Sequence, residues 1–162
     1  MVSRAKSFTI LIFILSIVLT VAPAAAETGI LSVTATVLSK SNCKFNSNTA
    51  TLNFGNLDPA SPVDRTVSTS ITFMCHGSAN PATFSITDDD GMYETGPNGN
   101  RMRHTTLTTE YLSYSLTLNP TAGTVPKNTD QTLTITGAVK GSEYQDAYVG
   151  NYSDTVVISI EP

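Results

Sequence analysis

The chain has 162 residues, of which 40% are hydrophobic and only 14% are charged, with 9 Lys and Arg against 13 Asp and Glu. This length fits one domain of ordinary size, and low charge with recurring apolar residues argues against intrinsic disorder. The formal net charge of −4 and the absence of a Lys or Arg cluster argue against nucleic-acid binding.

The first residues have the three parts of a secretory signal peptide. Arg4 and Lys6 supply positive charge, residues 10–21 are almost entirely apolar, and residues 24–26 are alanines that suit a signal peptidase. The apolar stretch is shorter than the ~20 residues of a membrane span, which disfavours the alternative of an uncleaved anchor. The sequence therefore predicts a signal peptide over residues 1–26 and an exported mature chain with no membrane span.

Alternation of apolar and polar residues dominates the mature chain, and this period of two predicts strands. Turn signals such as Asn-Gly and Asp-Gly separate the alternating segments, and three of them fall within residues 88–109, which we expect to be a long hairpin or surface loop. About seven strands predict an all-β fold, an immunoglobulin-like antiparallel β-sandwich. The predicted strands cover residues 31–37, 49–54, 67–75, 82–87, 111–118, 131–139 and 154–161.

The mature chain contains two cysteines, Cys43 and Cys75. Neither has partners at the spacing of a zinc site, although His76 adjoins Cys75. Two cysteines in an exported protein form a disulfide by default, because the compartment is oxidising. The sequence therefore predicts a Cys43–Cys75 bond, with two free thiols or a catalytic Cys–His pair as the alternatives.

Patterns for catalysis or metal binding are weak. Asp88, Asp89 and Asp90 are consecutive, so their carboxylates point in different directions and lack the spacing of a calcium loop. No nucleophile elbow accompanies His76 or His104. We therefore expect no enzyme, no cofactor and no metal site. The six tyrosines either line a sugar site or, more commonly, cap the sandwich core.

Four apolar side chains form one face of the segment that precedes Cys43, namely Leu31, Val33, Ala35 and Val37. Two interpretations stay open. The segment is the first strand of its own sandwich, which the pattern alone favours, or it extends from the body and completes a sheet edge of another copy. In the second case the head-to-tail contact does not close, so it generates a fibre.

Several short motifs follow one another along the chain in an order that resembles a known family. Residues 52–59 read Leu-Asn-Phe-Gly-Asn-Leu-Asp-Pro, a strand then ends in Cys75, residues 111–118 follow, and residues 150–156 read Gly-Asn-Tyr-Ser-Asp-Thr-Val. Together they resemble the spore coat protein U-like family, which includes the pilins of archaic chaperone–usher pili. The resemblance spans nearly all of residues 27–162. The ending Ile160-Glu161-Pro162 departs from the family's frequent aromatic end.

The resemblance implies an incomplete sandwich of about six to seven strands that a donated strand completes. A periplasmic chaperone would lend a strand, and assembly at an outer-membrane usher would replace it with residues 28–39 of the next subunit. Leu31, Val33, Ala35 and Val37 would be the donor side chains. The acceptor groove would have one wall formed by Val156, Ile158 and Ile160.

The function so implied is that of a structural pilus or fimbria subunit, exported through the inner membrane and periplasm to the cell surface, where it supports attachment and biofilm formation. Its partners would be other copies or related pilins, the chaperone and the usher. The alternatives are a spore or cyst coat protein, and a monomeric secreted β-sandwich that binds a glycan or a metal.

Overall fold

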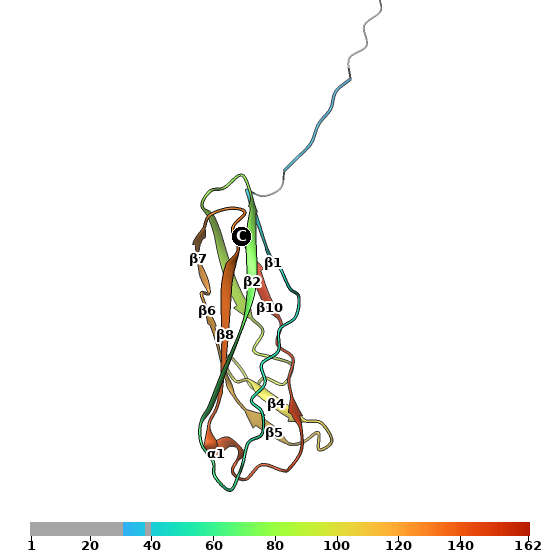
Figure 1. Cartoon of the computed structure of the whole chain (residues 1–162). Coiled ribbons are helices and arrows are strands. Elements are labelled where there is room, and N and C mark those ends of the chain that lie inside the picture. Colours follow the sequence, from blue (N-terminus) through green and yellow to red (C-terminus); the bar gives the residue numbers. More distant parts are fainter. Residues whose placement is uncertain (1–30, 38–39) are drawn as a thin grey trace, which may run out of the picture. The chain divides into compact units, whose positions relative to one another are not determined.

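The computed structural model describes residues 31–37 and 40–162 (Figure 1). The predicted signal peptide, and residues 28–30, 38 and 39 of the predicted donor segment, lie outside this part. The boundary between two compact units of the chain falls between Ala35 and Thr36. Every described strand belongs to the second unit, which begins at Thr36. The strands are β1 (Ser41–Phe45), β2 (Arg65–Gly77), β3 (Ala82–Asp88), β4 (Arg101–His104), β5 (Tyr111–Ser113), β6 (Ser115–Asn119), β7 (Ala122–Val125), β8 (Gln131–Val139), β9 (Tyr152–Ser153) and β10 (Ile158–Glu161). The described residues also form one helix, α1 (Gly141–Tyr144).

The strands form three antiparallel sheets, with the orders β1-β2-β8-β6, β10-β3-β7 and β5-β4-β9. The first two sheets enclose the main core, in which the rings of Phe73 on β2 and Phe84 on β3 lie 4.9 Å apart. A second cluster of buried residues packs beside the small third sheet and contains Phe54, Leu112, Val139 and Tyr144. The prediction of an all-β, immunoglobulin-like antiparallel sandwich is confirmed.

Strand β8 shows why alternation predicted this fold well. Leu133, Ile135 and Val139 point inward and are buried, whereas Thr132 and Thr134 are exposed. Since successive side chains of a strand point to opposite faces, one apolar face is enough to fix which side meets the core. Strands β2, β3 and β10 lie within or close to their predicted ranges for the same reason.

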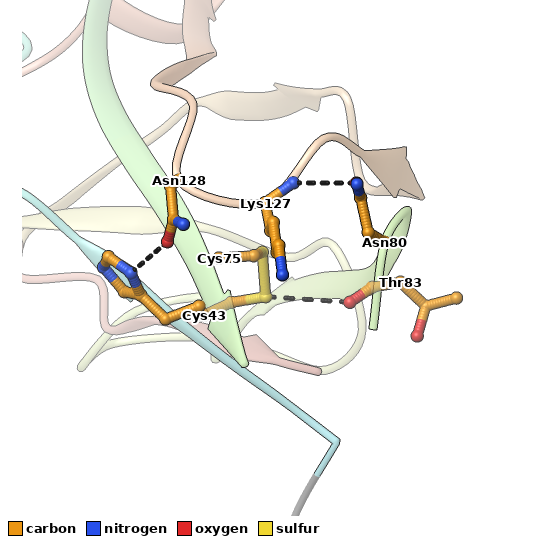
Figure 2. The surroundings of a disulfide bond; sticks show 7 residues. Cys43, Cys75, Asn80, Thr83, Lys127 and Asn128 are labelled. Carbon is orange, nitrogen blue, oxygen red and sulfur yellow. Dashed lines mark hydrogen bonds between the residues drawn. A yellow bond between two sulfur atoms is a disulfide. The ribbon is translucent and has the colours of Figure 1, made fainter. Parts of the chain in front are cut away.

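The disulfide between Cys43 and Cys75 joins β1 to β2, as predicted (Figure 2). The two cysteines stand opposite each other in the strand register, and both are buried in the main core. The sulfur of Cys43 lies 3.6 Å from the carbonyl oxygen of Thr83 on the facing sheet. The backbone N–H of Asn128 donates to the carbonyl of Cys75 at 2.9 Å. The bond therefore ties the short edge strand β1 to the centre of the sandwich.

Two predicted strands are absent, because residues 31–37 and 49–54 belong to no strand of the described chain. In residues 49–54 the alternation of apolar and polar residues comes from side-chain packing and not from strand pairing. Leu52 and Phe54 pack over Gly137 of β8, where an added Cβ would collide with both side chains. One face of the segment is therefore covered while its backbone stays outside the sheet ladders.

The predicted strand over residues 111–118 is two strands. The chain changes sheets at Tyr114, since β5 pairs with β4 whereas β6 pairs with β8. The backbone N–H of Tyr114 donates to the carbonyl of Asn100 at 3.1 Å instead of joining either ladder. Residues 88–109 form the expected turn-rich stretch, but they also contain β4. Strands β1, β7 and β9 were not predicted, because at two to five residues they are too short to show a period.

Asp88 ends β3 next to Asp89 and Asp90. Burial and the two neighbouring carboxylates, of which Asp90 acts more strongly, raise the pKa of Asp88 above its ordinary value. The folded protein therefore holds this proton more tightly than the unfolded chain does. It follows that the ionised form of Asp88 lowers stability at neutral pH, and that this loss is absent once the pH falls below the unfolded pKa.

We predict that replacing both Cys43 and Cys75 by Ala lowers the free energy of unfolding by about 3–4 kcal/mol, given their separation of 32 residues. Urea titration of the wild-type and double-variant proteins measures the difference. Wild-type protein treated with a reductant should behave like the variant. A loss below about 1 kcal/mol would show that the bond constrains little of the unfolded chain.

We also predict that Asp88→Asn raises the melting temperature at pH 7, and that the gain shrinks as the pH falls through the folded-state pKa of Asp88. Thermal melts at several pH values, read by circular dichroism, measure this trend. Asp146→Asn is the control, because it removes an exposed carboxylate from another part of the chain. An equal gain from both variants would assign the effect to net charge alone.

Candidate functional site

Two strands of the sandwich have a free edge toward each other. Within the described chain, β1 pairs only with β2, and β10 pairs only with β3. Strands β1 and β10 are nevertheless neighbours in contact, one from each sheet of the main core, and Figure 1 shows them side by side. Each is thus an edge strand of its sheet within the described chain, the kind of position at which a further strand can pair.

A groove of about 330 Å³ begins where β1 ends at Phe45 and runs along this side of the domain. Its floor includes Ile71, Leu116 and Ile135, from β2, β6 and β8 of the four-stranded sheet. One wall comes from the chain after β1, within residues 45–54, and the other from residues 152–158.

The floor of the groove is part of the main core. Phe45, Ile71, Leu116 and Ile158 are only half-buried, yet they pack against the fully buried cluster. Apolar side chains that pack on one side and face an open groove on the other are the features of a site for a further apolar element. The groove is thus an opening into the sandwich rather than a surface dent.

A second hollow of about 430 Å³ lies beside the groove. Both are lined by Leu52, Phe54, Met102 and Tyr152. The second hollow extends to the loop that contains Asn56.

The structure places the predicted groove residues at different points. Val156 and Ile158 line the groove. Ile160 lies further along β10, opposite Ile86 of β3, and packs against the main core outside the groove lining. The sequence put Ile71 and Leu116 on apolar strand faces, but alternation gives no signal for which apolar residues stay half-covered after folding.

The predicted donor side chains lie on the described segment of residues 31–37, which forms no strand. Leu31, Val33 and Val37 are 86%, 82% and 88% exposed, and Ala35 is exposed as well. Apolar side chains this exposed are uncommon as a regularly spaced set on a soluble protein.

Most tyrosines are already engaged. The hydroxyl of Tyr114 donates to Asp154 at 2.7 Å, and that of Tyr144 donates to the carbonyl of Val63 at 2.8 Å. The rings of Tyr93 and Tyr111 are each covered by a guanidinium group, from Arg103 at 4.4 Å and Arg101 at 4.2 Å. Such cation–π pairs occupy ring faces on which a sugar would stack.

His104, the candidate base, is buried with both ring nitrogens engaged. Its Nδ1 accepts hydrogen bonds from the backbone N–H groups of Thr106 and Leu107, at 3.0 and 2.9 Å. The proton is therefore assigned to Nε2, which donates to the carbonyl of Val149 at 3.1 Å. This imidazole holds two loops together and has no free nitrogen for proton transfer.

Among the described residues, no group of three or more His, Cys, Asp or Glu side chains could hold a metal ion. No helix within residues 31–37 and 40–162 is long and apolar enough to span a membrane.

Comparison with solved structures gives matches to twelve chains. One belongs to the structure described as "Chaperone-tip adhesin complex is vital for synergistic activation of CFA/I fimbriae biogenesis", with a TM-score of 0.47 and 12% sequence identity. The match covers 76% of this chain and 41% of that one, so the present chain spans less than half of that chain's length. No curated protein matches the sequence.

The family comparison covers far more of the sequence than any single motif. The model of the Spore Coat Protein U domain matches residues 27–159, which include both cysteines, all of β1, the first two residues of β10 and the residues that line the groove. The resemblance inferred from the order of the motifs is confirmed, and the chain belongs to the Spore Coat Protein U domain family.

Proposed function

We propose that this protein is a structural subunit of a secreted surface pilus or fimbria, and that its copies join by donor-strand exchange. The observation that carries this proposal is the groove with an apolar floor that begins beside the ends of β1 and β10, between residues 45–54 and residues 152–158. Family membership supports it, because the match includes the whole groove. A structural subunit of this kind has no catalytic role.

In this proposal, an extended segment from another copy supplies both a backbone partner for the edge strands and apolar side chains for the groove. Its backbone completes a sheet ladder, and its alternate side chains fill apolar pockets. Residues 28–39 are the proposed donor, since Leu31, Val33, Ala35 and Val37 recur with the period of a strand. Burying one Leu or Val side chain contributes about 1.5–3 kcal/mol, so several together give a contact that dissociates slowly.

The proposed contact leads to a fibre rather than a closed ring of two. The donor segment precedes Cys43, whereas the groove lies in the body of the domain, so one copy uses two different surfaces. Contacts between unlike surfaces repeat head to tail when the rotation does not close. A periplasmic chaperone would occupy the groove before assembly, an outer-membrane usher would exchange it for the next subunit, and the surface fibre would support attachment and biofilm formation.

The name of the family favours a second candidate, a spore or cyst coat protein that assembles at a cell surface without a pilus. The same groove and donor would serve that assembly. Neighbouring genes for a chaperone and an usher would favour the pilus, and a sporulating source without an usher would favour the coat. A monomeric glycan- or metal-binding sandwich has less support, because four of the six tyrosines have either the ring or the hydroxyl group engaged.

We predict that Val33→Asp abolishes multimers while the subunit stays soluble, because a carboxylate cannot enter an apolar pocket without losing its hydration. Size-exclusion chromatography and electron microscopy of the secreted protein measure assembly. Thr34→Asp is the matched control, since it places the same charge on the opposite face of the segment. Normal fibres from Val33→Asp, or equal loss from both variants, would contradict the donor assignment.

A further inference from the structure

The middle of the groove wall formed by residues 152–158 belongs to no sheet. Residues 154–157 connect β9 to β10 without a ladder partner, although Asp154 and Val156 line the groove. Their backbone is held by the loop after β3. The N–H of Asp89 donates to the carbonyl of Val157 at 3.1 Å, and the N–H of Met92 donates to the carbonyl of Thr155 at 3.1 Å. The position of this wall therefore depends on that loop.

The carboxylate of Asp154 joins three segments of the chain. Its Oδ2 accepts the hydroxyl of Tyr114 at 2.7 Å. Its Oδ1 accepts the N–H groups of Met92 at 3.0 Å and Thr155 at 2.8 Å. Burial and the Asp154 carboxylate raise the pKa of Tyr114 well above its usual value, so its hydroxyl stays protonated and able to donate.

The loop itself is fixed to the same tyrosine. The side-chain amide of the buried Asn100 donates to the carbonyl of Asp90 at 2.7 Å, and the N–H of Tyr114 donates to the carbonyl of Asn100 at 3.1 Å. Gly91 has a φ of +92°, and a Cβ at this position would collide with the Asp154 carboxylate. The hydrogen bonds thus connect Asp90 through Asn100, Tyr114 and Asp154 to Met92. Gly91 joins Asp90 to Met92 in the sequence, so the connection forms a ring.

We propose that Tyr114 and Asp154 form a clasp that positions the groove wall before a partner's strand arrives. The proposal rests on the proposed function and gives a role to the first part of the turn-rich stretch, residues 88–100. A wall without a ladder samples other positions unless side chains hold it. Loss of the clasp lowers the fraction of molecules with a formed groove, and the apparent affinity for the donor falls by the same factor.

The test uses the full chain carrying Val33→Asp, which keeps the groove but cannot donate. A fluorescent peptide of residues 28–39 is added, and its apparent Kd and association rate are measured by anisotropy. Tyr114→Phe and Asp154→Asn are then made in this background. Each should weaken peptide binding roughly tenfold, the factor expected when one hydrogen bond to a charged group no longer favours the formed groove.

Matched controls separate positioning from stability. Tyr144→Phe also removes a buried hydroxyl, which bonds both the N–H and the carbonyl of Val63 at 2.8 Å. Asp64→Asn also alters a carboxylate that accepts one backbone N–H, that of Gly141 at 2.9 Å. Neither residue lines the groove. The controls should lower the melting temperature to a similar extent and leave peptide affinity at the level of the parent protein.

The peptide-binding and refolding results each support or overturn the clasp. Equal affinity for clasp and control variants, measured well below every melting temperature, would overturn the clasp. If neither clasp variant folds alone, saturating peptide should restore the fold, because an occupied groove fixes the wall directly; failure to restore it also overturns the clasp. Absence of peptide binding to the parent protein with its clasp intact would instead refute donor-strand exchange and the clasp with it.

Discussion

The proposed function depends on a groove with a half-buried apolar floor, beside two strands that each pair with only one other strand in the described chain. Strands β1 and β10 are the first and last strands in the sequence, yet they are neighbours in the folded domain. Each is an edge strand of its sheet within the described chain. Backbone groups on such edges need a partner, and the half-buried floor beside them needs apolar cover. In the proposed assembly, one extended segment with alternate apolar side chains supplies both the backbone partner and the apolar cover.

The rest of the molecule holds this opening in shape. The disulfide fixes β1 to β2, so the first edge is anchored in the main core. The other edge is anchored at β10 by the ladder with β3, and its extension over residues 154–157 is held by the loop and by Asp154. A groove that is already formed loses little freedom when a strand binds, and such preorganisation strengthens binding without additional contacts.

Alternation predicted the sandwich because β8 buries nearly all of one face, and β2 turns one face toward the core and buries Phe73 and Cys75 on it. Alternation gave wrong strands where side chains are buried although the backbone of their segment does not pair in one continuous ladder. Leu52 and Phe54 are covered, but their segment joins no ladder, and Tyr114 sits where one apparent strand passes between two sheets. The groove could be foreseen in part, through Val156 and Ile158. The Tyr114–Asp154 bond joins residues 40 apart, so no local pattern indicates it.

The most direct test of strand donation is an SDS gel of the native secreted protein, loaded unboiled and boiled in neighbouring lanes. A donated strand buried along the whole groove dissociates slowly, so detergent at room temperature should leave multimers intact. The account predicts a ladder of bands in the unboiled lane that collapses to a single monomer band on boiling. A single monomer band in both lanes would contradict it.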